Sequence, residues 1–374
     1  MKTLQIGLEW MPERAGGLPR YYYESWVASH GLYDFRGLVI GSPQVAQSSN
    51  GEVVGFAPSS APLLRRLRLA RQACRTMTAE WKPDLLVSHF ALTTLPLVGI
   101  VDAPLVLQFH GPWAMEGQVE GHHGLRHSIK KWTENRVYHR ATRAITLSQA
   151  FAEVLAREYG YPAEKIDVIP GGVNVARFNI DSDRAASRSR LGWPQDRPIV
   201  VAVRRLVPRM GLETLIDAAA DLRKRHGDFL IKIAGKGRLS ESLQARITAL
   251  GLENHVELLG FVPDEDLPHI YRAADLSIIP TQALEGFGLI ALEALAAGTP
   301  VLVSPVGGLP EVVTDLDQRL ILPSPGRGDI AAGLEAALYG GAVPSADACL
   351  AHARRFDWKE IAVRLRDAYA RALA

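Results

Sequence analysis

Short runs of apolar and β-branched residues recur along this chain, separated by segments with helical periodicity. Such runs, without polar alternation, are typical of strands that are buried on both faces of a parallel sheet covered by helices. They form two series, one in each half of the chain, at residues 4–8, 37–41, 84–89, 105–110 and 144–147, and then at 199–203, 229–234, 256–260, 276–280 and 301–304. The sequence therefore predicts an α/β fold with two parallel sheets.

A chain of 374 residues is too long for one ordinary core, because single hydrophobic cores stop growing at about 250–300 residues. The polar stretch 179–198, which is punctuated by prolines, separates the two series of runs. Linkers between domains commonly have this composition. We therefore predict two domains that meet near residue 180, and an amphipathic helix in the C-terminal segment 357–374.

Composition argues against several classes of protein. Hydrophobic residues make up 47% and charged residues 22%, which is typical of a soluble globular protein. The net charge of +2 is small for a nucleic-acid-binding protein. Two cysteines, Cys74 and Cys349, form neither a disulfide framework nor a thiolate-rich metal site. The N-terminus "MKTLQIGLEW" lacks signal-peptide features and no apolar run reaches the ~20 residues of a membrane span, so we expect a cytoplasmic protein.

In open parallel sheets, ligands bind beyond the carboxyl ends of the strands, in the loops that lead into helices. After the first run comes "AGGLPRYYYESW", in which Gly16 and Gly17 allow close approach of the backbone and Pro19 suits the first helical position. Backbone N–H groups at such a helix start bind anions, and phosphate is the anion that we expect here. A plain turn explains two consecutive glycines equally well.

Two histidines stand at the ends of predicted strands. The run 105–110 ends in "QFHGPW", which places His110 beside a Gly-Pro turn at the carboxyl edge. An imidazole there can donate a hydrogen bond to a sugar hydroxyl or a phosphate oxygen, and a structural role for such a residue is about as common. His89 ends another run, in "LLVSHF", and for this residue we favour a structural role.

Basic side chains follow two strands of the second series. Arg204 and Arg205 come directly after the run 199–203, where a guanidinium can hold a diphosphate with two hydrogen bonds. The stretch "IAGKGRL" places a Gly-Lys-Gly turn, residues 235–237, after the next run. This turn lacks the third glycine of a dinucleotide-binding fingerprint and the acidic residue beyond it. We therefore reject a dehydrogenase and keep the interpretation that this loop lines a nucleotide pocket.

The stretch "ALEGFGLIALEALAAGTPVLVS" carries two glutamates, Glu285 and Glu293, eight residues apart. If a helix begins near Phe287, helical rise places the two carboxylates roughly 10 to 12 Å apart on one face. One carboxylate would then accept from sugar hydroxyls and the other from ribose hydroxyls of a nucleotide sugar. The N–H groups of residues 288–290 would point at the diphosphate between them. The alternative is that Glu285 is a helix-start residue and Glu293 a solvated side chain.

Taken together, these motifs resemble those of the retaining GT-B glycosyltransferases of family GT4. The Glu-x7-Glu motif of that family appears as "EGFGLIALE", and its downstream glycine-rich pattern as "AAGTPVLVSPVGGLPE". The resemblance extends in the same order through "GGLPRYYYE", "FHGPW", "LSQAF", "VIPGGVNVARF", "AGKGRL" and "LLGFVPDEDLPHIYRAADL". It implies two Rossmann-like, doubly wound domains that face each other across a cleft: an acceptor domain at residues 1–180 with a return helix at 356–374, and a nucleotide-sugar donor domain at 181–355.

The resemblance also implies roles for individual residues. His110 would contact the transferred sugar, Arg205 would hold the diphosphate and Glu285 would bind the sugar hydroxyls, so these three are the expected catalytic residues. Glu293 would bind the ribose. Transfer of a hexose from a UDP- or GDP-sugar to a saccharide or lipid-linked acceptor would retain the anomeric configuration and need no metal ion or other cofactor. The other residues expected at the donor site are Gly16, Gly17, Arg204, Arg209, Gly235, Lys236, Gly237, Gly286, Phe287, Gly288, Leu289 and Ile290.

One position departs from the family pattern. Where the family has Arg-x4-Lys-Gly, this chain has "RLVPRMG", so Met210 stands in place of a phosphate-binding lysine. Arg209 is the neighbouring cation, although adjacent positions point in different directions. Since a diphosphate site that lacks one charge binds and stabilises less well, a catalytically weak nucleotide-sugar-binding partner or sensor is one alternative function. A nucleotide-sugar epimerase or phosphorylase is another.

Basic residues are in modest excess in the first half, where the first 179 residues carry 19 Lys and Arg against 15 Asp and Glu. The segments 64–75 and 126–143 combine arginines and lysines with apolar residues, a pattern typical of helices that lie on anionic membranes. This interpretation predicts peripheral association with the cytoplasmic face of a membrane, which would suit a lipid-linked acceptor. A solvated helix face is the other interpretation.

Overall fold

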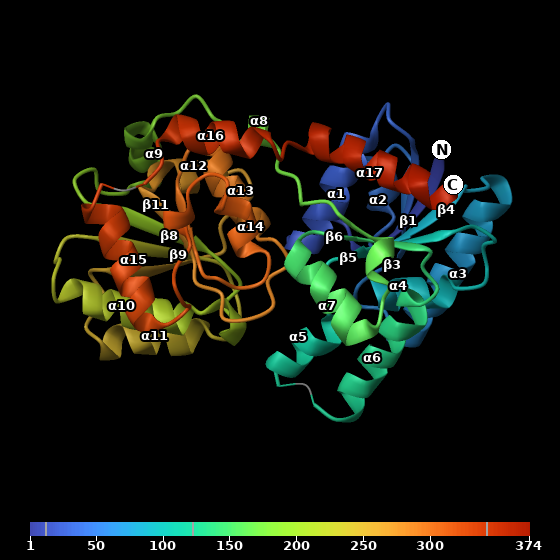
Figure 1. Ribbon diagram of the computed structural model, residues 1–374, viewed down its shortest axis with the longest axis horizontal. Helices are drawn as coiled ribbons and strands as arrows, with labels where there is room; N and C mark the ends of the chain where they lie inside the picture. The colour runs from blue at the N-terminus through green and yellow to red at the C-terminus, as the bar shows by residue number, and fades with distance from the viewer. Residues whose placement is uncertain (12, 122, 342) are drawn as a thin grey trace. The chain divides into compact units, whose positions relative to one another are not determined.

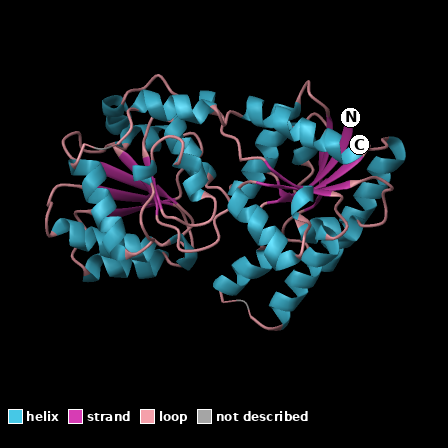
Figure 2. Ribbon diagram, in the orientation of Figure 1, coloured by secondary structure: helices cyan, strands magenta, loops and turns pink. Residues whose placement is uncertain are grey.

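The computed structural model describes residues 1–11, 13–121, 123–341 and 343–374, which form two compact units (Figures 1 and 2). Unit 1 comprises Met1–Gly172 and Trp358–Ala374, and unit 2 comprises Val173–Asp357. The chain thus leaves unit 1 several residues before the boundary predicted at residue 180. It returns to unit 1 with its last helix, α17 (Trp358–Leu373).

The stretch predicted as a linker contains helix α9 (Arg184–Leu191) instead. Asp183 caps this helix by accepting a hydrogen bond from the Ala186 N–H at 2.7 Å, and Gly192 ends it in a left-handed conformation with φ of 67°. Arg188 is buried and donates to the Ala273 carbonyl at 2.9 Å and to Asp275 at 2.6 Å. The polar residues that indicated a linker therefore cap and anchor a helix of unit 2.

Unit 1 contains a sheet of seven strands in the order β3-β2-β1-β4-β5-β6-β7, and all neighbouring strands run parallel. This order, with its reversal at β1, is that of a Rossmann-like sheet. The strands are β1 (Lys2–Glu9), β2 (Asp34–Ile40), β3 (Val53–Ala57), β4 (Leu85–Ser88), β5 (Leu105–Phe109), β6 (Arg143–Thr146) and β7 (Ile166–Val168). The sequence missed β3 and β7, the two short edge strands.

Helices cover both faces of this sheet (Figure 2). Helices α1 (Gly17–Ser29) and α17 lie together over one face, and helices α3 (Leu63–Glu80), α6 (Leu125–Tyr138) and α7 (Gln149–Tyr159) pack on the other. The remaining helices are short and lie in the connections: α2 (Gln44–Ser48), α4 (Ala91–Thr94), η1 (Leu95–Leu97), α5 (Trp113–Val119) and η2 (Ala163–Lys165).

The two faces of the unit 1 sheet differ in polarity. On β1, the fully buried Leu4 and Ile6 belong to the apolar core under α3, α6 and α7. Alternate residues of a strand point to opposite faces, so Thr3 and Gln5, also fully buried, point toward α1 and α17. There Gln108 of β5 donates to the Tyr369 hydroxyl of α17 at 3.2 Å. Unit 1 thus has a buried layer of hydrogen-bonded polar side chains beneath α1 and α17.

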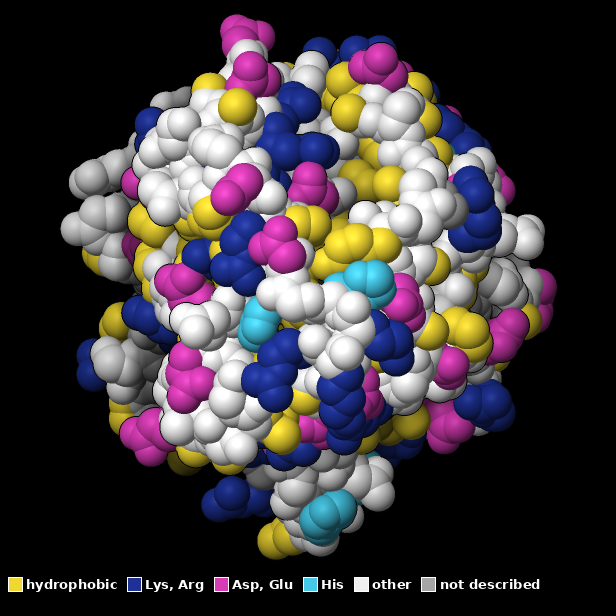
Figure 3. Space-filling model, turned by 90° about the vertical axis from the view of Figure 1, so that its left-hand side faces the viewer, with side chains coloured by type: hydrophobic (Ala, Val, Ile, Leu, Met, Phe, Trp, Pro, Cys, Tyr) yellow, Lys and Arg dark blue, Asp and Glu magenta, His cyan; other side chains and the backbone are white. Residues whose placement is uncertain are grey.

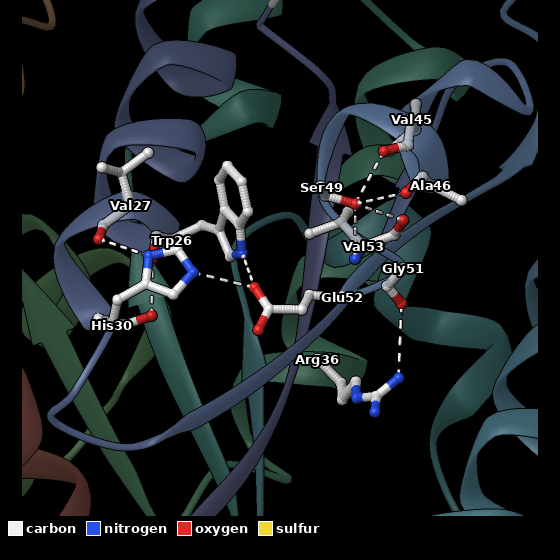
Figure 4. Close-up of polar contacts among 11 residues, drawn as sticks. Trp26, Val27, His30, Arg36, Val45, Ala46, Ser49, Gly51, Glu52 and Val53 are labelled. Carbon is white, nitrogen blue, oxygen red and sulfur yellow. Dashed lines mark hydrogen bonds and ion pairs between the residues drawn. The ribbon is translucent and has the colours of Figure 1, made fainter.

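Side-chain contacts hold the edge of this sheet to the end of α1 (Figure 4). The Glu52 carboxylate accepts hydrogen bonds from the indole N–H of Trp26 at 2.7 Å and from His30 Nε2 at 3.0 Å. The Ser49 hydroxyl accepts from the Val53 N–H at 3.0 Å. These contacts fix the segment that leads into β3, the edge strand whose glycine-containing sequence gave no clear strand signal.

Unit 2 contains a second parallel sheet of five strands in the order β10-β9-β8-β11-β12. Its strands are β8 (Ile199–Val203), β9 (Leu230–Ala234), β10 (Val256–Gly260), β11 (Leu276–Ile279) and β12 (Val301–Val303). Each of these five strands coincides with a run that the sequence predicted as a strand. The helices are α8 (Val175–Phe178), α9, η3 (Pro208–Met210), α10 (Leu212–Arg223), α11 (Ser240–Ala249), α12 (Leu267–Ala273), α13 (Leu289–Ala296), α14 (Leu309–Val313), η4 (Gln318–Leu320), α15 (Arg327–Tyr339) and α16 (Ala346–Arg354).

The outer helices of unit 2 are linked by exposed ion pairs. Arg246 of α11 pairs with Asp217 of α10 at 2.5 Å, and Arg225 pairs with Glu335 of α15 at 2.9 Å. On the face drawn in Figure 3, basic and acidic side chains are correspondingly interspersed, without a large area of one sign. Exposed pairs of this kind contribute about 0–1 kcal/mol each, so the core sheet rather than these pairs fixes the position of the site.

Candidate active site

A group of buried charges in unit 2 lies where β8 and β11 end. Arg204 follows β8 directly and is buried. Its Nη2 lies 2.5 Å from Glu285 Oε2, 2.5 Å from the Thr281 hydroxyl and 2.7 Å from the sulfur of Met210. Glu285 and Thr281 belong to the loop that leaves β11, so the sheet topology brings this group together. Arg204 and Glu285, which the sequence analysis placed separately at the donor site, thus meet at the carboxyl edge of the sheet.

This arrangement controls the charge of Glu285. Burial alone would raise the pKa of the carboxyl group, but the Arg204 guanidinium, with a smaller contribution from Arg209, lowers the pKa below its usual range. Glu285 is therefore ionised at neutral pH. A carboxylate accepts hydrogen bonds and does not donate them, which suits contact with hydroxyl groups.

Arg209 shapes the loop on which Glu285 sits. It is buried, and its Nη1 donates to the carbonyl of Leu284 at 2.8 Å. Leu284 has a positive φ of 54°, a conformation that costs a residue other than glycine about 1–3 kcal/mol. On the other side, the Gly308 N–H donates to the Glu285 carbonyl at 3.0 Å. The Glu285 backbone is therefore held from two directions, as expected for a side chain that must be presented accurately.

The sequence analysis predicted that the two glutamates share one helical face, and this prediction is wrong. Helix α13 begins at Leu289, with Gly288 as the preceding residue in a left-handed conformation, so Glu285 lies in the loop and only Glu293 is helical. Glu293 is buried, and its Oε2 accepts a hydrogen bond from the Tyr271 hydroxyl at 3.1 Å. Burial of Glu293 also contradicts the alternative of a solvated side chain.

The turn between the glutamates is packed against the start of α14 and the segment that follows α16. Phe287 is buried against Phe356, with ring centroids 5.8 Å apart. A Cβ at Gly288, whose φ is +86°, would lie 2.5 Å from the Leu309 side chain. Gly286, Leu289 and Ile290 are partly exposed. The start of α13, with its uncapped N–H groups, is thus the part of the turn that stays accessible.

The Gly-Lys-Gly turn after β9 lies against the Arg204 segment. A Cβ at Gly235 would lie 1.8 Å from the Arg204 carbonyl oxygen, and a Cβ at Gly237 would lie 2.2 Å from that of Leu206. Close backbone packing therefore explains both glycines. Lys236 between them is exposed, and its ammonium lies over the Phe261 ring. Arg205, also exposed, has a side chain that pairs with none of the residues the structure describes.

Met210 packs into this group where the family pattern has a lysine. The residue is buried, and its thioether contacts the Arg204 guanidinium. The cations near Glu285 are therefore Arg204 and Arg209, both of which contact the Glu285 loop. The contact of Thr281 with Arg204 was not evident from the sequence, because a lone threonine after a strand carries no specific signal.

In unit 1, the sequence-predicted residues lie on two loops. Helix α1 begins at Gly17, so Pro19 occupies its third rather than its first position. Gly16 and Gly17 are exposed, and no side chain caps the helix. His110 follows β5 and is half-buried, and its Nε2 lies 3.1 Å from Nδ1 of His89. The hydrogen bond to His89 was not foreseen from the sequence.

The described residues contain no group of three His, Cys, Asp or Glu side chains placed to hold a metal ion. The charged groups of the candidate site are therefore two arginines and a glutamate at the edge of the unit 2 sheet, together with the buried Glu293. Arginines in such a site can bind phosphate oxygens, and carboxylates can bind hydroxyl groups.

The chain matches two glycosyltransferase families. Residues 33–177 match Glycosyltransferase Family 4, and residues 183–355 match Glycosyl transferases group 1. A D-inositol 3-phosphate glycosyltransferase from Segniliparus rotundus is 32% identical over 305 residues, which are 78% of this chain and 67% of that protein. A GDP-mannose-dependent alpha-(1-6)-phosphatidylinositol monomannoside mannosyltransferase from Mycolicibacterium smegmatis is 40% identical over 161 residues, 41% of this chain and 42% of that protein. Several other relatives are matched over about half of their length.

Solved structures share the fold over nearly the whole chain. A sucrose-phosphate synthase from Thermosynechococcus elongatus has a TM-score of 0.82 at 21% identity, with 99% of both chains covered. An Anabaena protein in complex with UDP and glucose has a TM-score of 0.78 at 22% identity, with 98% of both chains covered. The chain therefore has the GT-B fold and belongs to the family 4 glycosyltransferases.

Proposed function

We propose that this glycosyltransferase moves a hexose from a UDP- or GDP-sugar to a saccharide or lipid-linked acceptor with retention of the anomeric configuration. The observation that carries the proposal is the buried Arg204–Glu285 pair at the carboxyl edge of the unit 2 sheet, the edge at which α/β sheets bind ligands. The match to a GDP-mannose-dependent enzyme and the likeness to a protein solved with UDP and glucose motivate the choice of donors.

In this proposal, unit 2 is the donor domain. The exposed Arg205 and the buried Arg204 and Arg209 neutralise the diphosphate as negative charge develops on the leaving group. The uncapped start of α13, near Gly288, adds backbone N–H donors. Preorganised donors of this kind commonly supply the largest part of the rate enhancement. The exposed Lys236 lies on the neighbouring loop and adds positive charge to the donor site.

The two glutamates bind hydroxyl groups in this proposal. Glu285, held ionised by Arg204, accepts hydrogen bonds from the transferred sugar. Glu293, whose carboxylate accepts a hydrogen bond from Tyr271, accepts hydrogen bonds from the ribose hydroxyls. In unit 1, which acts as the acceptor domain, His110 contacts the transferred sugar, and Gly16 and Gly17 allow a phosphate or the acceptor to approach the start of α1.

Retention follows if the acceptor attacks the face of the sugar that the diphosphate leaves. The acceptor oxygen then forms the new bond to the anomeric carbon as the bond to the diphosphate oxygen breaks. The proton of the acceptor hydroxyl passes to an oxygen of the leaving diphosphate. No additional base is needed in this scheme, and the protein's task is to stabilise the charge on the diphosphate.

The exposed apolar residues of α6 support membrane association of unit 1. Leu125, Ile129 and Trp132 are 77%, 54% and 59% exposed, and their spacing places them on one side of the helix. Helix α3 adds Leu64, which is 80% exposed, with exposed arginines at positions 65, 68, 71 and 75. The sequence analysis predicted a basic helix at residues 126–143, but the helix α6 ends at Tyr138. Arg143 lies in β6 instead and pairs with Asp167 at 3.0 Å.

We propose that these helices attach the protein peripherally to the cytoplasmic face of an anionic membrane. None of the helices among the described residues is long and apolar enough to cross a bilayer. Co-sedimentation with vesicles containing phosphatidylserine should bring down wild-type protein and less of Trp132→Ala, and high salt should reduce binding of both. If Trp132→Ala bound the vesicles as well as the wild-type protein, α6 would not contact the membrane.

Turnover with a retained anomeric configuration is the test of the proposed function. Purified protein is incubated with each candidate donor and a set of saccharide and lipid-linked acceptors, and the anomeric proton of the product is read by NMR. Release of nucleoside diphosphate together with a retained product supports the proposal. An inverted product contradicts it. Binding of donor without any turnover would favour the partner or sensor function that Met210 suggested.

A further inference from the structure

Buried polar side chains connect His110 to the interior of unit 1. His110 Nε2 lies 3.1 Å from His89 Nδ1, and the two rings lie nearly parallel with centroids 5.4 Å apart. His89 Nε2 lies 2.8 Å from Gln5 Oε1, and Gln5 Nε2 lies 3.3 Å from the Thr3 hydroxyl. The Thr3 hydroxyl donates to the Asp34 backbone carbonyl at 3.2 Å. Thr3, Gln5 and His89 are fully or almost fully buried.

The Asp34 carbonyl fixes the direction of every hydrogen bond in this chain. A carbonyl oxygen accepts only, so the single hydrogen of the Thr3 hydroxyl points at Asp34. The Thr3 oxygen must then accept from the Gln5 amide, which turns Gln5 Oε1 toward His89. His89 Nε2 therefore carries a proton that it donates to Gln5.

The same reasoning sets the proton on His110. In neutral His89 one ring nitrogen donates and the other accepts, so Nδ1 accepts the hydrogen bond from Nε2–H of His110. Nδ1 of His110 then carries a lone pair, and it makes no hydrogen bond to any residue in the described part of the chain. Aromatic rings surround the pair: Tyr21 lies 4.6 Å from His110 and Tyr22 lies 5.0 Å from His89 between ring centroids.

Both imidazoles are neutral at physiological pH. Burial, and then the neighbouring His110, lower the pKa of His89 well below its usual value. Burial lowers the pKa of His110 to about 3. A charged His89 would also donate from Nδ1, which would oblige His110 Nε2 to accept where it now donates.

We propose that Thr3, Gln5 and His89 are positioning residues that hold His110 as the Nε2–H tautomer, so that Nδ1 accepts a hydrogen bond from a hydroxyl group of the transferred sugar. The proposal rests on the proposed function for the identity of the ligand. It reverses the expectation that His110 donates, and it gives His89 a part in the site that the sequence analysis did not assign.

The direction of this hydrogen bond decides which sugars the site accepts. A hydroxyl group can donate to Nδ1, whereas a fluorine substituent or a bare hydrogen cannot. At the position that His110 contacts, a deoxyfluoro sugar should therefore bind as weakly as the deoxy sugar. If His110 donated instead, fluorine would keep part of the interaction and the deoxyfluoro sugar would bind better than the deoxy sugar.

The tautomer can be read directly from the ligand-free protein. Two-bond proton–nitrogen correlation spectra of protein labelled with ¹⁵N-histidine distinguish protonated from unprotonated ring nitrogens. The protein has 11 histidines, so His89 and His110 are assigned from the signals lost in His89→Gln and His110→Gln. At neutral pH we expect a proton on Nε2 alone in both residues. A proton on Nδ1 of His110 would overturn the proposal.

Variants test whether the buried chain sets the tautomer. Thr3→Val keeps the branched shape but removes the group that orients the Gln5 amide, so the Nε2–H population of His110 should fall. Gln5→Met, which removes the acceptor for His89, should act in the same way. Thr146→Val is the matched control, because Thr146 is a buried strand residue of the same sheet whose hydroxyl donates to the Ser148 carbonyl at 3.1 Å. Unchanged His110 signals in Thr3→Val and Gln5→Met would overturn the positioning role.

Binding of sugar analogues tests the contact itself. Deoxy and deoxyfluoro forms of the preferred nucleotide sugar are titrated into wild type and His110→Ala. One position should show an equal loss for both analogues, about two- to tenfold for one hydrogen bond, and this loss should disappear in His110→Ala. Better binding of the deoxyfluoro form would overturn the accepting role. If no nucleotide sugar binds, the proposed function fails, and the spectra of the free protein still decide the tautomer.

Discussion

The loops beyond the two sheets carry different kinds of side chain, charged in unit 2 and uncharged in unit 1. Beyond the unit 2 sheet, Arg204 and Arg209 surround the ionised Glu285. Beyond the unit 1 sheet, neutral His110 and His89 form a hydrogen-bonded pair with no charge. Both loops follow central strands of Rossmann-like sheets, so topology does not explain the difference. In the proposed function the chemistry of the ligand explains it, because a diphosphate needs positive charge whereas a sugar needs directed hydrogen bonds.

The two sites are supported by different parts of their units. The neutral site is held by polar residues of the unit 1 sheet itself, including Thr3 and Gln5 of β1. The charged site is held by loops, with Arg209 on the Leu284 carbonyl and Gly235 against the Arg204 carbonyl. The comparison teaches that one sheet architecture can present either kind of group when the residues just beyond the strands change.

Removal of Arg204 should have the largest effect. Arg204→Ala leaves Glu285 without its partner in a half-buried position, and we expect the free energy of unfolding to fall by about 3–5 kcal/mol. In the proposed function, kcat/KM should fall by about two to three orders of magnitude. Chemical denaturation and an assay of transfer measure the two effects.

The matched control for Arg204→Ala is Arg225→Ala. Arg225 is half-exposed and pairs with Glu335, and loss of a surface pair should cost no more than about 1 kcal/mol and leave transfer unchanged. If Arg204→Ala behaves like this control, the charged site is not a functional centre and the contrast between the two sheets collapses.

Removal of Glu293 should weaken nucleotide binding. Hydrogen bonds to charged groups contribute about 1.5–3 kcal/mol, so Glu293→Ala should raise the Kd of the preferred nucleotide about ten- to a hundredfold by calorimetry. Tyr271→Phe is the control, because it removes the hydroxyl that contacts Glu293 but keeps the carboxylate. An equal loss in both variants would indicate that the carboxylate serves only to hold Tyr271.

Replacement of Met210 by lysine should add a positive charge beside Arg204 and change the affinity for a nucleoside diphosphate. Met210→Lys places an ammonium beside the Arg204 guanidinium, so the ligand-free protein should melt at a lower temperature. Diphosphate binding should relieve this repulsion, and we expect about tenfold tighter binding of the nucleoside diphosphate. Met210→Leu, a change of similar volume, should leave affinity as in wild type. Unchanged affinity in Met210→Lys would place the diphosphate away from this residue.

The last prediction concerns the dependence of stability on pH. Because the pKa of His110 is about 3 in the folded protein and about 6.5 in an unfolded chain, the unfolded state binds the proton first as pH falls. Stability conferred by neutral His110 is therefore complete above pH 6.5 and is lost as pH decreases toward 3. The pKa of Glu285 is lowered in the folded protein, so ionised Glu285 contributes stability at neutral pH. This contribution is lost only below about pH 4.3, the usual pKa of glutamate.

Denaturation at a series of pH values separates the two units. His110→Gln should flatten the decline between pH 6.5 and 4.5, and Glu285→Gln should flatten it only at lower pH. The same slope between pH 6.5 and 4.5 in wild type and His110→Gln would show that this histidine is not the group that titrates.

Much of the fold was predictable from the sequence. Every predicted run corresponds to a strand, because continuous apolar runs between helical segments are typical of the strands of a parallel sheet. The edge strands β3 and β7 were missed, since the glycine in "VVGFA" and the short length of "IDV" weaken that signal. The supposed linker at 179–198 proved to contain α9, because Arg188, one of the polar residues that indicated a linker, is buried and binds Asp275 and backbone carbonyls.

The identity of the site residues was more predictable than their geometry. Arg204 and His110 could be chosen because they stand just beyond strands, and Glu285 because of the motif that it forms with Glu293. The start of α13 could not be located, because the left-handed Gly288 and Leu284 keep Glu285 out of the helix. Nor could the sequence pair His89 with His110, because β4 and β5 become neighbours only in the folded sheet.

A calorimetric titration of UDP, GDP and ADP, and of their glucose, mannose, galactose and N-acetylglucosamine conjugates, tests the central claim most directly. The account predicts that one nucleotide series binds the wild-type protein with one site per chain. It predicts that Arg204→Ala and Glu293→Ala weaken this binding, whereas Arg225→Ala does not. Absence of binding by every nucleotide, or equal binding by all three variants, would contradict the claim that the loops beyond the unit 2 sheet hold a nucleotide sugar.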